Sequence, residues 1–600
     1  MRNVINPGIL LITSAFLLAI GFSTTAAAKT IYVNDDGPAD FNNIQAVIND
    51  ANDGDTIIVA DGIYRGNGNR DIDFKGKVIT LRSENGPDTC VIDCQGTPEN
   101  PHRGFKFHNG ETSAALLDGL TITGGYGAEE PVGPAFLPLV SSGGAIFNIN
   151  SSPTIRNCIF LRNTASYYGA GVYNGGGNIT LSNCSFIENT AVSVSRGGGM
   201  YSTSGTPTLT NCTFKNNSAG YLGGALFNAG SNPRLNNCAF IGNPRAIYNC
   251  TSNSTFTNCI FIGNSNAMTN WYYSHPTLIN CIFTGNSGGS KGTIYNNQSA
   301  PIFINCTFSG NSGDQGSALL NQCGSNPVLT NCILWDSGNE ICDHHDGSLS
   351  TVTYSDIYSG YPGAGNSNVD PLFIDADGAD NVVGTEDDNL RLLPDSPCID
   401  AGDPNYVCEP NETDLDGRPR IIGGRIDMGA YEFSMIAIEV PMKFTPQAIN
   451  CNSKGKWVKA HFVLPEEFAV EDVDANTPAK IESLGIKSDH LNVFINEDGL
   501  VEIEAAFDRA AFCDAVKSCG PIEITVTGSL TSGQYFYGTD IIEIIKNSFE
   551  CLAILSPHWL ELNCGKPNWC NGFDADRDTT VNLKDFAIMA LHWLEGNNKE

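Results

Sequence analysis

Apolar and polar residues alternate in short runs through residues 141–335, and these runs recur along the chain. Residues 154–160, for example, read Thr, Ile, Arg, Asn, Cys, Ile and Phe. Such runs predict short β-strands, because an amphipathic helix needs a pattern of about 10–12 residues. The dipeptide Asn-Cys marks each recurrence, at 157–158, 183–184, 211–212, 237–238, 258–259, 280–281, 305–306 and 331–332. A repeat of 21 to 28 residues indicates a solenoid of stacked turns.

Strands that coil parallel to their successors form a β-helix, and parallel crossovers are overwhelmingly right-handed. We therefore predict a mainly β fold built on a right-handed parallel β-helix. Seven Asn-Cys copies run into the pattern F-x-x-N, from Phe160/Asn163 to Phe308/Asn311. Equivalent side chains in stacked turns lie ~4.8 Å apart, which predicts a buried ladder of Cys thiols and a ladder of Asn amides at turns. A metal or redox array is the alternative, but the repeat lacks His and C-x-x-C.

Two segments near the N-terminus carry distinct signals. Residues 1–28 have the order of a secretory signal, with Arg2, an apolar run at 8–22 and small residues before Lys29. A membrane anchor is the alternative, but the run is short for a bilayer. We predict export, with no later transmembrane segment. Within residues 40–50, Ile44, Val47 and Ile48 have helical spacing and predict a helix that caps the open end of the solenoid.

Export implies an oxidising environment, in which close Cys pairs are candidates for local disulfides. Those pairs are Cys90/Cys94, Cys398/Cys408, Cys513/Cys519 and Cys564/Cys570. The connectivity stays open, and the total of 21 Cys leaves at least one thiol unpaired within the chain.

Two further modules follow the solenoid. Residues 441–546 contain alternating runs at 457–463, 501–505 and 522–527, whose spacing predicts a small antiparallel β-sandwich that serves as a spacer or binding module. Residues 547–600 contain a calcium-loop spacing. Asp574, Asp576, Asp578, Asn582 and Asp585 place oxygens at loop positions 1, 3, 5, 9 and 12, and Thr580 supplies a carbonyl at position 7. A helical run follows at 586–594, so we predict Ca²⁺ as the cofactor, although Thr579 replaces the usual Gly at position 6.

Several of these patterns resemble known families. Residues 44–59 resemble the opening of pectin-lyase-like right-handed β-helix proteins, and the Gly-Gly-Ala-Ile and F-x-x-N units are similar to the repeats of polymorphic outer-membrane proteins. Residues 390–402 and 414–432 resemble the terminal signature of bacterial surface β-helix proteins. The resemblance implies a β-helix with an N-terminal cap over residues 29–433. It implies no particular activity, because this fold carries lyases, hydrolases and adhesins.

The last 50 residues also contain a duplication. Residues 552–561 match residues 586–595 at an offset of 34, and the paired loop–helix unit resembles a dockerin, which implies a cohesin-like partner. The loop equivalent to 574–585 keeps Asp540 at position 1 but has Ile542 and Ile544 at positions 3 and 5, so one calcium is expected. The repeated His-Trp pair at helical spacing indicates core packing.

Charge is distributed very unevenly. The chain carries a net charge of −32, yet residues 140–335 hold seven basic and two acidic residues. Residues 336–440 hold 22 acidic and 4 basic residues. The acidic balance argues against a nucleic-acid partner, because binding phosphates needs a basic surface.

The same distribution bears on catalysis. Glycoside hydrolysis needs paired carboxylates, and lyases that resemble pectate lyase need acidic calcium ligands with an Arg or Lys base. The central solenoid offers only Glu188 and Asp314, 126 residues apart. Two candidate groups remain elsewhere: Arg103, Lys106, His108 and Asp118, and the run Asp343, His344, His345, Asp346, which we interpret mainly as a solvated turn. The acidic segment with Asp375, Asp377, Asp380, Glu386, Asp387 and Asp388 is either a solvated connection or a second calcium site.

These observations favour an exported β-helix protein at the cell surface or outside the cell. We expect it to bind a polysaccharide, a cell-surface glycan or a protein, or to act as a scaffold component, attached through its calcium-binding dockerin-like tail. The alternative is a polysaccharide lyase or glycoside hydrolase. We assign no catalytic residue.

Overall fold

The computed structural model describes residues 27–130, 140–336, 338–344, 346–410, 412–422, 424–433, 437–466, 468–531 and 534–546. The chain divides into two compact units, which we describe separately. The N-terminal unit comprises residues up to Thr277 together with Ile294–Ala300, and the C-terminal unit comprises Leu278–Thr293 and residues from Pro301 onward. Nearly all of the signal sequence (residues 1–26) and the whole calcium and dockerin-like module, with Asp574, Asp576, Asp578, Thr580, Asn582 and Asp585, lie outside the described residues.

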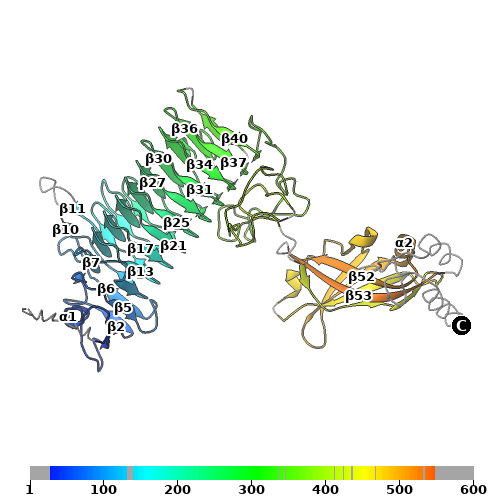
Figure 1. The fold of residues 1–600 in the computed structure, drawn as a ribbon, viewed down its shortest axis with the longest axis horizontal. Coiled ribbons are helices and arrows are strands. Elements are labelled where there is room, and N and C mark those ends of the chain that lie inside the picture. The colour runs from blue at the N-terminus through cyan, green and yellow to red at the C-terminus, as the bar shows by residue number, and fades with distance from the viewer. Residues whose placement is uncertain are drawn as a thin grey trace, which may run out of the picture. The chain divides into compact units, whose positions relative to one another are not determined.

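Each turn of the N-terminal unit contributes one short strand to each of three parallel sheets (Figure 1). Sheet A contains, in order, β1 (Thr30–Val33), β2 (Thr56–Val59), β5 (Thr80–Ser83), β8 (Leu116–Asp118), β13 (Thr154–Arg156), β17 (Thr180–Ser182), β21 (Thr208–Thr210), β25 (Arg234–Asn236) and β28 (Thr255–Thr257). Sheet B contains β3 (Gly62–Tyr64), β6 (Cys90–Asp93), β9 (Thr121–Thr123), β14 (Ile159–Leu161), β18 (Ser185–Ile187), β22 (Thr213–Lys215), β26 (Ala239–Ile241) and β29 (Ile260–Ile262).

Sheet C contains β4 (Ile72–Asp73), β7 (Phe105–Phe107), β12 (Ile146–Ile149), β16 (Val172–Gly175), β20 (Met200–Thr203), β24 (Leu226–Ala229), β27 (Ile247–Cys250), β30 (Met268–Trp271) and β33 (Ile294–Asn297). Two smaller sheets join the turns: the hairpin β10 (Glu129–Glu130) and β11 (Val140–Ser141), and the parallel set β15 (Thr164–Ala165), β19 (Thr190–Ala191) and β23 (Ser218–Ala219). The strands of one sheet pair in register, so equivalent side chains of successive turns stack.

The Asn-Cys dipeptide forms the corner between a sheet A strand and a sheet B strand. In all eight copies the Asn has a left-handed backbone with φ between 51 and 55°. Asn tolerates this conformation better than other residues with a Cβ. The Cys that follows is buried in every copy, and in the first the Sγ of Cys158 donates to the carbonyl of Arg156 at 3.2 Å. The predicted ladder of buried thiols is therefore confirmed.

The Asn of F-x-x-N forms a second, fully internal ladder. Asn163 donates from its side-chain nitrogen to the amide oxygen of Asn189 at 3.0 Å and to the carbonyl of Ile122 at 2.9 Å. Asn189 repeats these bonds with Asn217 and with the carbonyl of Phe160. The Phe rings of the same motif stack beside it, at 4.3 Å between the Phe186 and Phe214 centroids. The ladder satisfies backbone groups that burial would otherwise leave unpaired.

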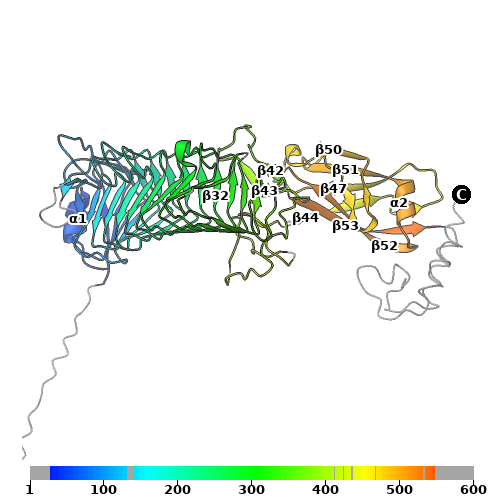
Figure 2. The ribbon, with the colours of Figure 1, turned by 90° about the horizontal axis from the view of Figure 1, so that it is seen from above.

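A short helix closes the N-terminal end of this unit, as predicted (Figure 2). Helix α1 (Ile44–Asp50) buries Ile44, Val47 and Ile48. Asn43 caps it by accepting a hydrogen bond from the amide of Ala46 at 2.8 Å. The apolar face thus covers core residues of the first turn, which would otherwise face water.

The C-terminal unit continues the same pattern and then changes. Its strands in sheet A are β31 (Thr277–Ile279), β34 (Ile302–Ile304), β37 (Val328–Thr330) and β40 (Thr351–Thr353). Those in sheet B are β32 (Ile282–Thr284), β35 (Thr307–Ser309), β38 (Ile333–Trp335) and β41 (Asp356–Ile357). Those in sheet C are β36 (Leu319–Gln322) and β39 (Ile341–Asp343). In the terminal segment, residues 372–433, the described residues form one strand pair, the hairpin β42 (Phe373–Asp375) and β43 (Asn389–Leu392).

Residues 437–545 form two sheets around one apolar cluster. One sheet contains β44 (Ala437–Glu439), β46 (Ala448–Asn450), β48 (Lys480–Ile481), β49 (Ile486–Lys487), β52 (Gly520–Ser529) and β53 (Tyr535–Ile545). The other contains β45 (Met442–Thr445), β47 (Trp457–Val463), β50 (His490–Ile495) and β51 (Val501–Asp508), and helix α2 (Arg509–Ala515) follows it. Pairing is antiparallel except where β44 and β46 run parallel to β53.

Two sequence-based expectations are corrected here. Cys513 bonds to Cys451, 62 residues away, and not to Cys519, while Cys90, Cys94, Cys398 and Cys408 are free. The sequence pairs were chosen for closeness along the chain, but strand geometry decides which thiols meet. In addition, Asp540, Ile542 and Ile544 lie in strand β53 and not in a metal loop. Asp540 instead accepts the backbone N–H of Phe444 at 2.8 Å.

Candidate functional site

The outward side of sheet C carries one continuous register of side chains, which we call the sheet C column. Its members, turn by turn, are Asp73, Lys106, Phe147, Tyr173, Tyr201, Phe227, Tyr248, Thr269 and Tyr295. The residues on either side of each, such as Ile146 and Asn148, are buried in the interior. The column therefore begins with two ionisable residues and continues as a row of aromatic rings that Thr269 interrupts.

Five consecutive rings of the column stack face to face. Phe147, Tyr173, Tyr201, Phe227 and Tyr248 have centroids 5.1–5.7 Å apart and interplanar angles of 4–11°. This spacing is imposed by the stacked strands and lies within the range in which aromatic pairs attract. Phe147, Tyr173, Tyr201 and Phe227 are only 2–8% exposed and form one buried cluster, against which the half-buried Tyr248 packs.

Neighbouring turns wall in the aromatic stack. The Tyr168 ring stacks on Tyr201 at 4.5 Å, the Arg196 guanidinium lies 5.3 Å from the Phe227 centroid, and the Arg103 guanidinium lies 4.6 Å from that of Phe147. Burial raises the pKa of Tyr201 to about 12 and raises the pKa values of Tyr173 and Tyr248 well above the ordinary tyrosine value. These phenols therefore remain neutral hydrogen-bond donors at physiological pH.

The ionisable end of the column contains two His–Asp contacts. His102 Nδ1 lies 2.6 Å from Asp71 Oδ2, and His108 Nε2 lies 3.4 Å from Asp73 Oδ2. Lys106 stands opposite Asp73 in the register. The sequence had singled out Lys106 and His108 but not Asp71, Asp73 or His102. Only the register of β4 with β7 reveals them, because the partners are separated by about 30 residues of chain.

The other two members of that sequence group lie elsewhere. Asp118 belongs to sheet A, where it contacts Arg156 at 2.9 Å and accepts the Asn157 amide at 2.8 Å. Arg103 is fully buried, and its guanidinium donates to the carbonyl of Ala128 at 2.8 Å in addition to covering Phe147. Arg103, Lys106, His108 and Asp118 therefore do not form one site.

Asp343 is the half-buried last residue of strand β39, and Asp346 lies in the turn that follows. Asp343 accepts hydrogen bonds from the Tyr361 hydroxyl at 2.6 Å, from the amide of Ser350 at 2.9 Å and from Asn321 at 2.8 Å. Burial acts to raise its pKa, but these hydrogen bonds outweigh burial and lower it. His344 is exposed and lies 3.7 Å from Asp346, while His345 lies outside the described residues. Asp343 thus follows Asn321 in the register of sheet C and continues its inner column of Asn residues.

The acidic segment 375–388 folds back on its own backbone. Asp387 accepts the amide of Asp380 at 3.2 Å, and Asp388 accepts that of Gly384 at 2.8 Å and the Thr284 hydroxyl of β32 at 2.5 Å. Burial, and next the neighbouring Asp377, raise the pKa of Asp375. Over the described part of the chain, no three His, Cys, Asp or Glu side chains converge closely enough to hold a metal ion.

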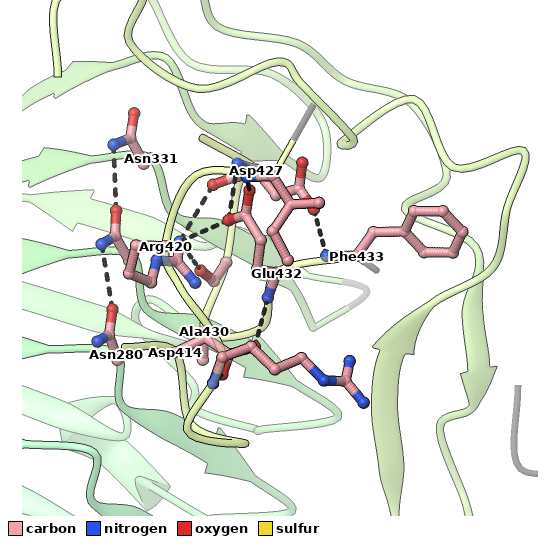
Figure 3. Close-up of polar contacts among 12 residues, drawn as sticks. Asn280, Asn331, Asp414, Arg420, Asp427, Ala430, Glu432 and Phe433 are labelled. Atoms are coloured by element: carbon pink, nitrogen blue, oxygen red, sulfur yellow. Dashed lines mark hydrogen bonds and ion pairs between the residues drawn. The ribbon is translucent and has the colours of Figure 1, made fainter. Parts of the chain in front are cut away.

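The terminal segment contains a buried network of charged residues (Figure 3). Arg420 lies 3.8 Å from Glu432 and donates to the carbonyls of Asp427 and Gly429 at 3.3 and 3.1 Å. Asp414 accepts the amides of Arg418 and Glu432 at 2.7 and 2.9 Å. Burial raises the pKa of Glu432 to about 8 and that of Asp427 to about 6. Since all four side chains are buried and bonded mainly to backbone, the network holds the segment together.

A buried pair of acids, Asp336 and Glu340, lies at the end of the internal ladder formed by the Asn residues of F-x-x-N. Asp336 takes the next place in the ladder and accepts both the backbone and side-chain N–H groups of Asn311 at 2.9 Å. Its own amide donates to Glu340 at 2.8 Å, and Ser317 donates to the other Glu340 oxygen at 2.9 Å. Burial, and next the neighbouring Asp336, raise the pKa of Glu340 to about 9. At neutral pH this pair therefore retains a proton.

Comparison with known proteins identifies the fold. A family model described as a right handed beta helix region matches residues 185–291, which confirms the predicted right-handed parallel β-helix. Similar solved structures include pectin methylesterase from carrot, with 10% identity and a TM-score of 0.25, covering 55% of this chain and 89% of that one. Another is polygalacturonase from Erwinia carotovora ssp. carotovora, with 12% identity and a TM-score of 0.29, covering 55% and 99%. No curated protein sequence matches this chain. No described helix has both the length and the apolar character to cross a membrane.

Proposed function

We propose that this chain is an exported, non-catalytic β-helix protein that binds a polysaccharide along the sheet C column. The observation that carries the proposal is the row of stacked aromatic rings along the outer side of sheet C, where Tyr201 is 8% exposed and Tyr248 is half-buried. A sugar ring has an apolar face of C–H groups and a rim of hydroxyls. Tyr matches both, because it joins an apolar body to a polar tip.

The composition of the column favours binding over turnover. From β12 to β30 the strands of sheet C contain no Asp, Glu, Lys, Arg or His. Hydrolysis of a glycosidic bond needs two carboxyl groups on either side of it. An extended chain lying over these strands would meet aromatic, amide and hydroxyl side chains, together with the Arg196 guanidinium beside Phe227.

The remaining modules complete the proposal. The signal sequence would export the protein, and the two-sheet module of residues 437–545 would serve as the small β-sandwich spacer. Asp574, Asp576, Asp578, Thr580, Asn582 and Asp585 would bind one Ca²⁺ and tether the protein to a cohesin-like partner or a surface. Their order of oxygen ligands supports this part. Calorimetry of the full chain should show calcium binding that Asp574→Ala removes; unchanged binding would refute the assignment.

Affinity electrophoresis of the full chain against a polysaccharide panel tests the binding site. We expect at least one polysaccharide to retard migration. The double variant Tyr173→Phe, Tyr201→Phe should weaken this binding roughly five- to tenfold, because each lost hydrogen bond contributes about 1 kcal/mol or less. Tyr32→Phe on sheet A is the matched control, with no change expected. Equal binding by all three proteins would place the glycan elsewhere.

The alternative function is that of a polysaccharide lyase or glycoside hydrolase, and one observation favours it. The His102–Asp71 and His108–Asp73 contacts and Lys106 lie at the start of the same column, where proton transfer to a bound glycan is chemically feasible. Reducing-end and unsaturated-uronate assays on the same panel decide the matter. Turnover that disappears in His108→Ala or Lys106→Ala would replace the binding proposal.

A further inference from the structure

The turn that leads from sheet C to sheet A, which we call the C–A corner, has the same backbone from β12 to β33. The residue after each of these seven sheet C strands is left-handed, with φ between 50 and 76°. These residues are Asn150, Gly176, Ser204, Gly230, Thr251, Tyr272 and Gln298. Six of the seven are Gly or polar residues. Tyr272 is the only aromatic residue among them.

The corner that contains Tyr272 has one residue more than its neighbours. Cys250, Trp271 and Asn297 are equivalent in the register of sheet C. Buried serines occupy equivalent positions at the other end of the corner. The amide of Ser252 donates to the Ser274 hydroxyl at 3.1 Å, and the amide of Ser274 donates to the Ser299 hydroxyl at 3.2 Å. One residue separates these landmarks in the neighbouring turns, whereas Tyr272 and Tyr273 both lie between Trp271 and Ser274. Tyr273 is therefore an insertion.

Folding does not explain this insertion. Tyr273 is 66% exposed and also left-handed, with a φ of 58°. A bulky residue in that conformation costs free energy, and its exposure means that burial returns little of it. Tyr272 is 49% exposed, and its ring meets that of Trp271 edge to face at 5.4 Å. Two aromatic rings are thus presented to solvent from a rigid, repeated corner.

The surroundings of the two rings are polar and almost free of charge. The corner turns at 175–179, 203–207, 229–233, 250–254, 271–276 and 297–301 contain no Asp, Glu, Lys or Arg, and Arg234 begins β25 just beyond one of them. Asn253 accepts the amide of His275 at 2.8 Å, and His275 Nδ1 accepts that of Ala300 at 2.9 Å. The exposed Asn253 retains its amide NH₂ as a donor.

We propose that Tyr272 and Tyr273 form a stacking platform for a sugar ring of a neutral polysaccharide that runs along the C–A corner. This inference rests on the proposed function and names its substrate class. Aromatic faces bind the C–H face of a sugar, and the amides and hydroxyls of adjacent corners match its hydroxyl rim. An acidic glycan would need Arg or Lys opposite its carboxylates, and the corner turns contain neither.

The test uses the full chain with neutral polysaccharides (xyloglucan, galactomannan and mixed-linkage β-glucan) and with polygalacturonate. We expect binding to a neutral polysaccharide that is unchanged between roughly 0.05 and 0.5 M NaCl, since no charges pair. Tyr273→Ala should weaken it roughly tenfold. Deletion of Tyr273, which restores the length of the neighbouring corners, should weaken it at least as much while leaving the melting temperature unchanged or higher. Tyr32→Ala, a comparably exposed tyrosine on sheet A, should have no effect.

The outcomes separate this inference from the proposed function. Glycan binding that is unchanged in Tyr273→Ala and in the deletion overturns the corner site but leaves the proposed function standing. Salt-sensitive preference for polygalacturonate overturns the neutral class. Absence of binding to every polysaccharide overturns both. A deletion that lowers the melting temperature would show that Tyr273 serves folding and would remove the argument from its exposure.

Discussion

The Asn-Cys corner occurs in both units with the same backbone but in different surroundings. In the N-terminal unit Asn157, Asn183 and Asn211 are exposed. Their side-chain amides bond along the ladder at 3.0 and 3.1 Å, and Asn157 also donates to Asp118 at 2.8 Å. In the C-terminal unit Asn305 and Asn331 bond along the ladder at the same distance, 3.1 Å, yet both are buried. One repeated motif therefore has two environments.

The terminal segment makes the difference. Asn331 accepts the amide of Asp403 at 2.7 Å through its side chain and that of Gly429 at 2.8 Å through its backbone. Asn280 donates to the carbonyl of Thr413 at 2.8 Å. The ladder thus serves as a row of hydrogen-bonding groups on which a non-repetitive segment docks. A repeat specifies the geometry of each turn, while a segment outside the repeat decides which turns are covered.

The largest expected effect comes from breaking the network that holds the terminal segment. Arg420→Ala should cost about 3–5 kcal/mol, because it leaves the buried Asp427 carboxylate without a nearby cation and the carbonyls of Asp427 and Gly429 without their donor. Hydrogen exchange at the Asn331 corner should then approach that of the Asn183 corner. Arg156→Ala in the N-terminal unit, which removes an ion pair with an exposed arginine, is the control and should cost less than ~1 kcal/mol. Equal costs would show that the network is not what secures the segment.

A matched pair of corner variants measures the effect of covering directly. Asn183→Ala and Asn331→Ala both place alanine in a left-handed corner, at a cost of about 1–2 kcal/mol. Asn331→Ala also leaves the half-buried amide of Asp403 without its acceptor, which adds about 1 kcal/mol. Urea denaturation of both variants should therefore rank Asn331→Ala as the more destabilising. The same loss in both would mean that burial of the corner adds nothing.

The internal ladder, formed by the Asn residues of F-x-x-N, provides a pH-dependent version of the comparison. In the C-terminal unit this ladder ends in Asp336 and Glu340, whereas in the N-terminal unit it contains Asn, which does not titrate. The pKa of Glu340 rises from 4.5 to about 9, so the folded chain binds more protons than the unfolded chain between those values. Its contribution to stability is complete below about 4.5 and declines as pH rises toward about 9.

Thermal unfolding at a series of pH values checks this expectation. Stability should fall with pH by up to about 1.4 kcal/mol per unit across that window. Glu340→Gln should remove most of this slope, and its advantage over the natural chain should grow toward pH 9. A variant with an undiminished slope would assign the titration to another group, such as Glu432.

The smallest effect is expected on the open face of the N-terminal unit. The Arg162–Glu188 contact at 2.7 Å is largely exposed, so Arg162→Gln should change stability by about 0.5 kcal/mol or less. Salt should reduce even that effect. A loss comparable with that of Asn331→Ala would show that this face is covered in solution.

Local and repeated features were predictable from the sequence. The Asn-Cys and F-x-x-N patterns predicted the strands, the buried thiols and the amide ladders, because each depends on neighbours within one turn and the next. The capping helix was predictable for the same reason. Candidate sites were not, since Lys106 and His108 meet Asp73 through the register, while Asp118 belongs to another sheet. The Cys451–Cys513 bond joins residues 62 apart, beyond the reach of a spacing argument.

By itself, the sequence determined the shape of a turn: short alternating strands, a left-handed Asn corner and an inward-facing Cys and Phe. Each of these depends on backbone sterics and on burial of one face, which any copy of the repeat satisfies. Only the tertiary structure decided which corners are buried, which aromatic rings stack and that Tyr273 is an extra residue. Those outcomes depend on contacts such as that of Asn331 with Asp403, 72 residues away, which no local pattern encodes.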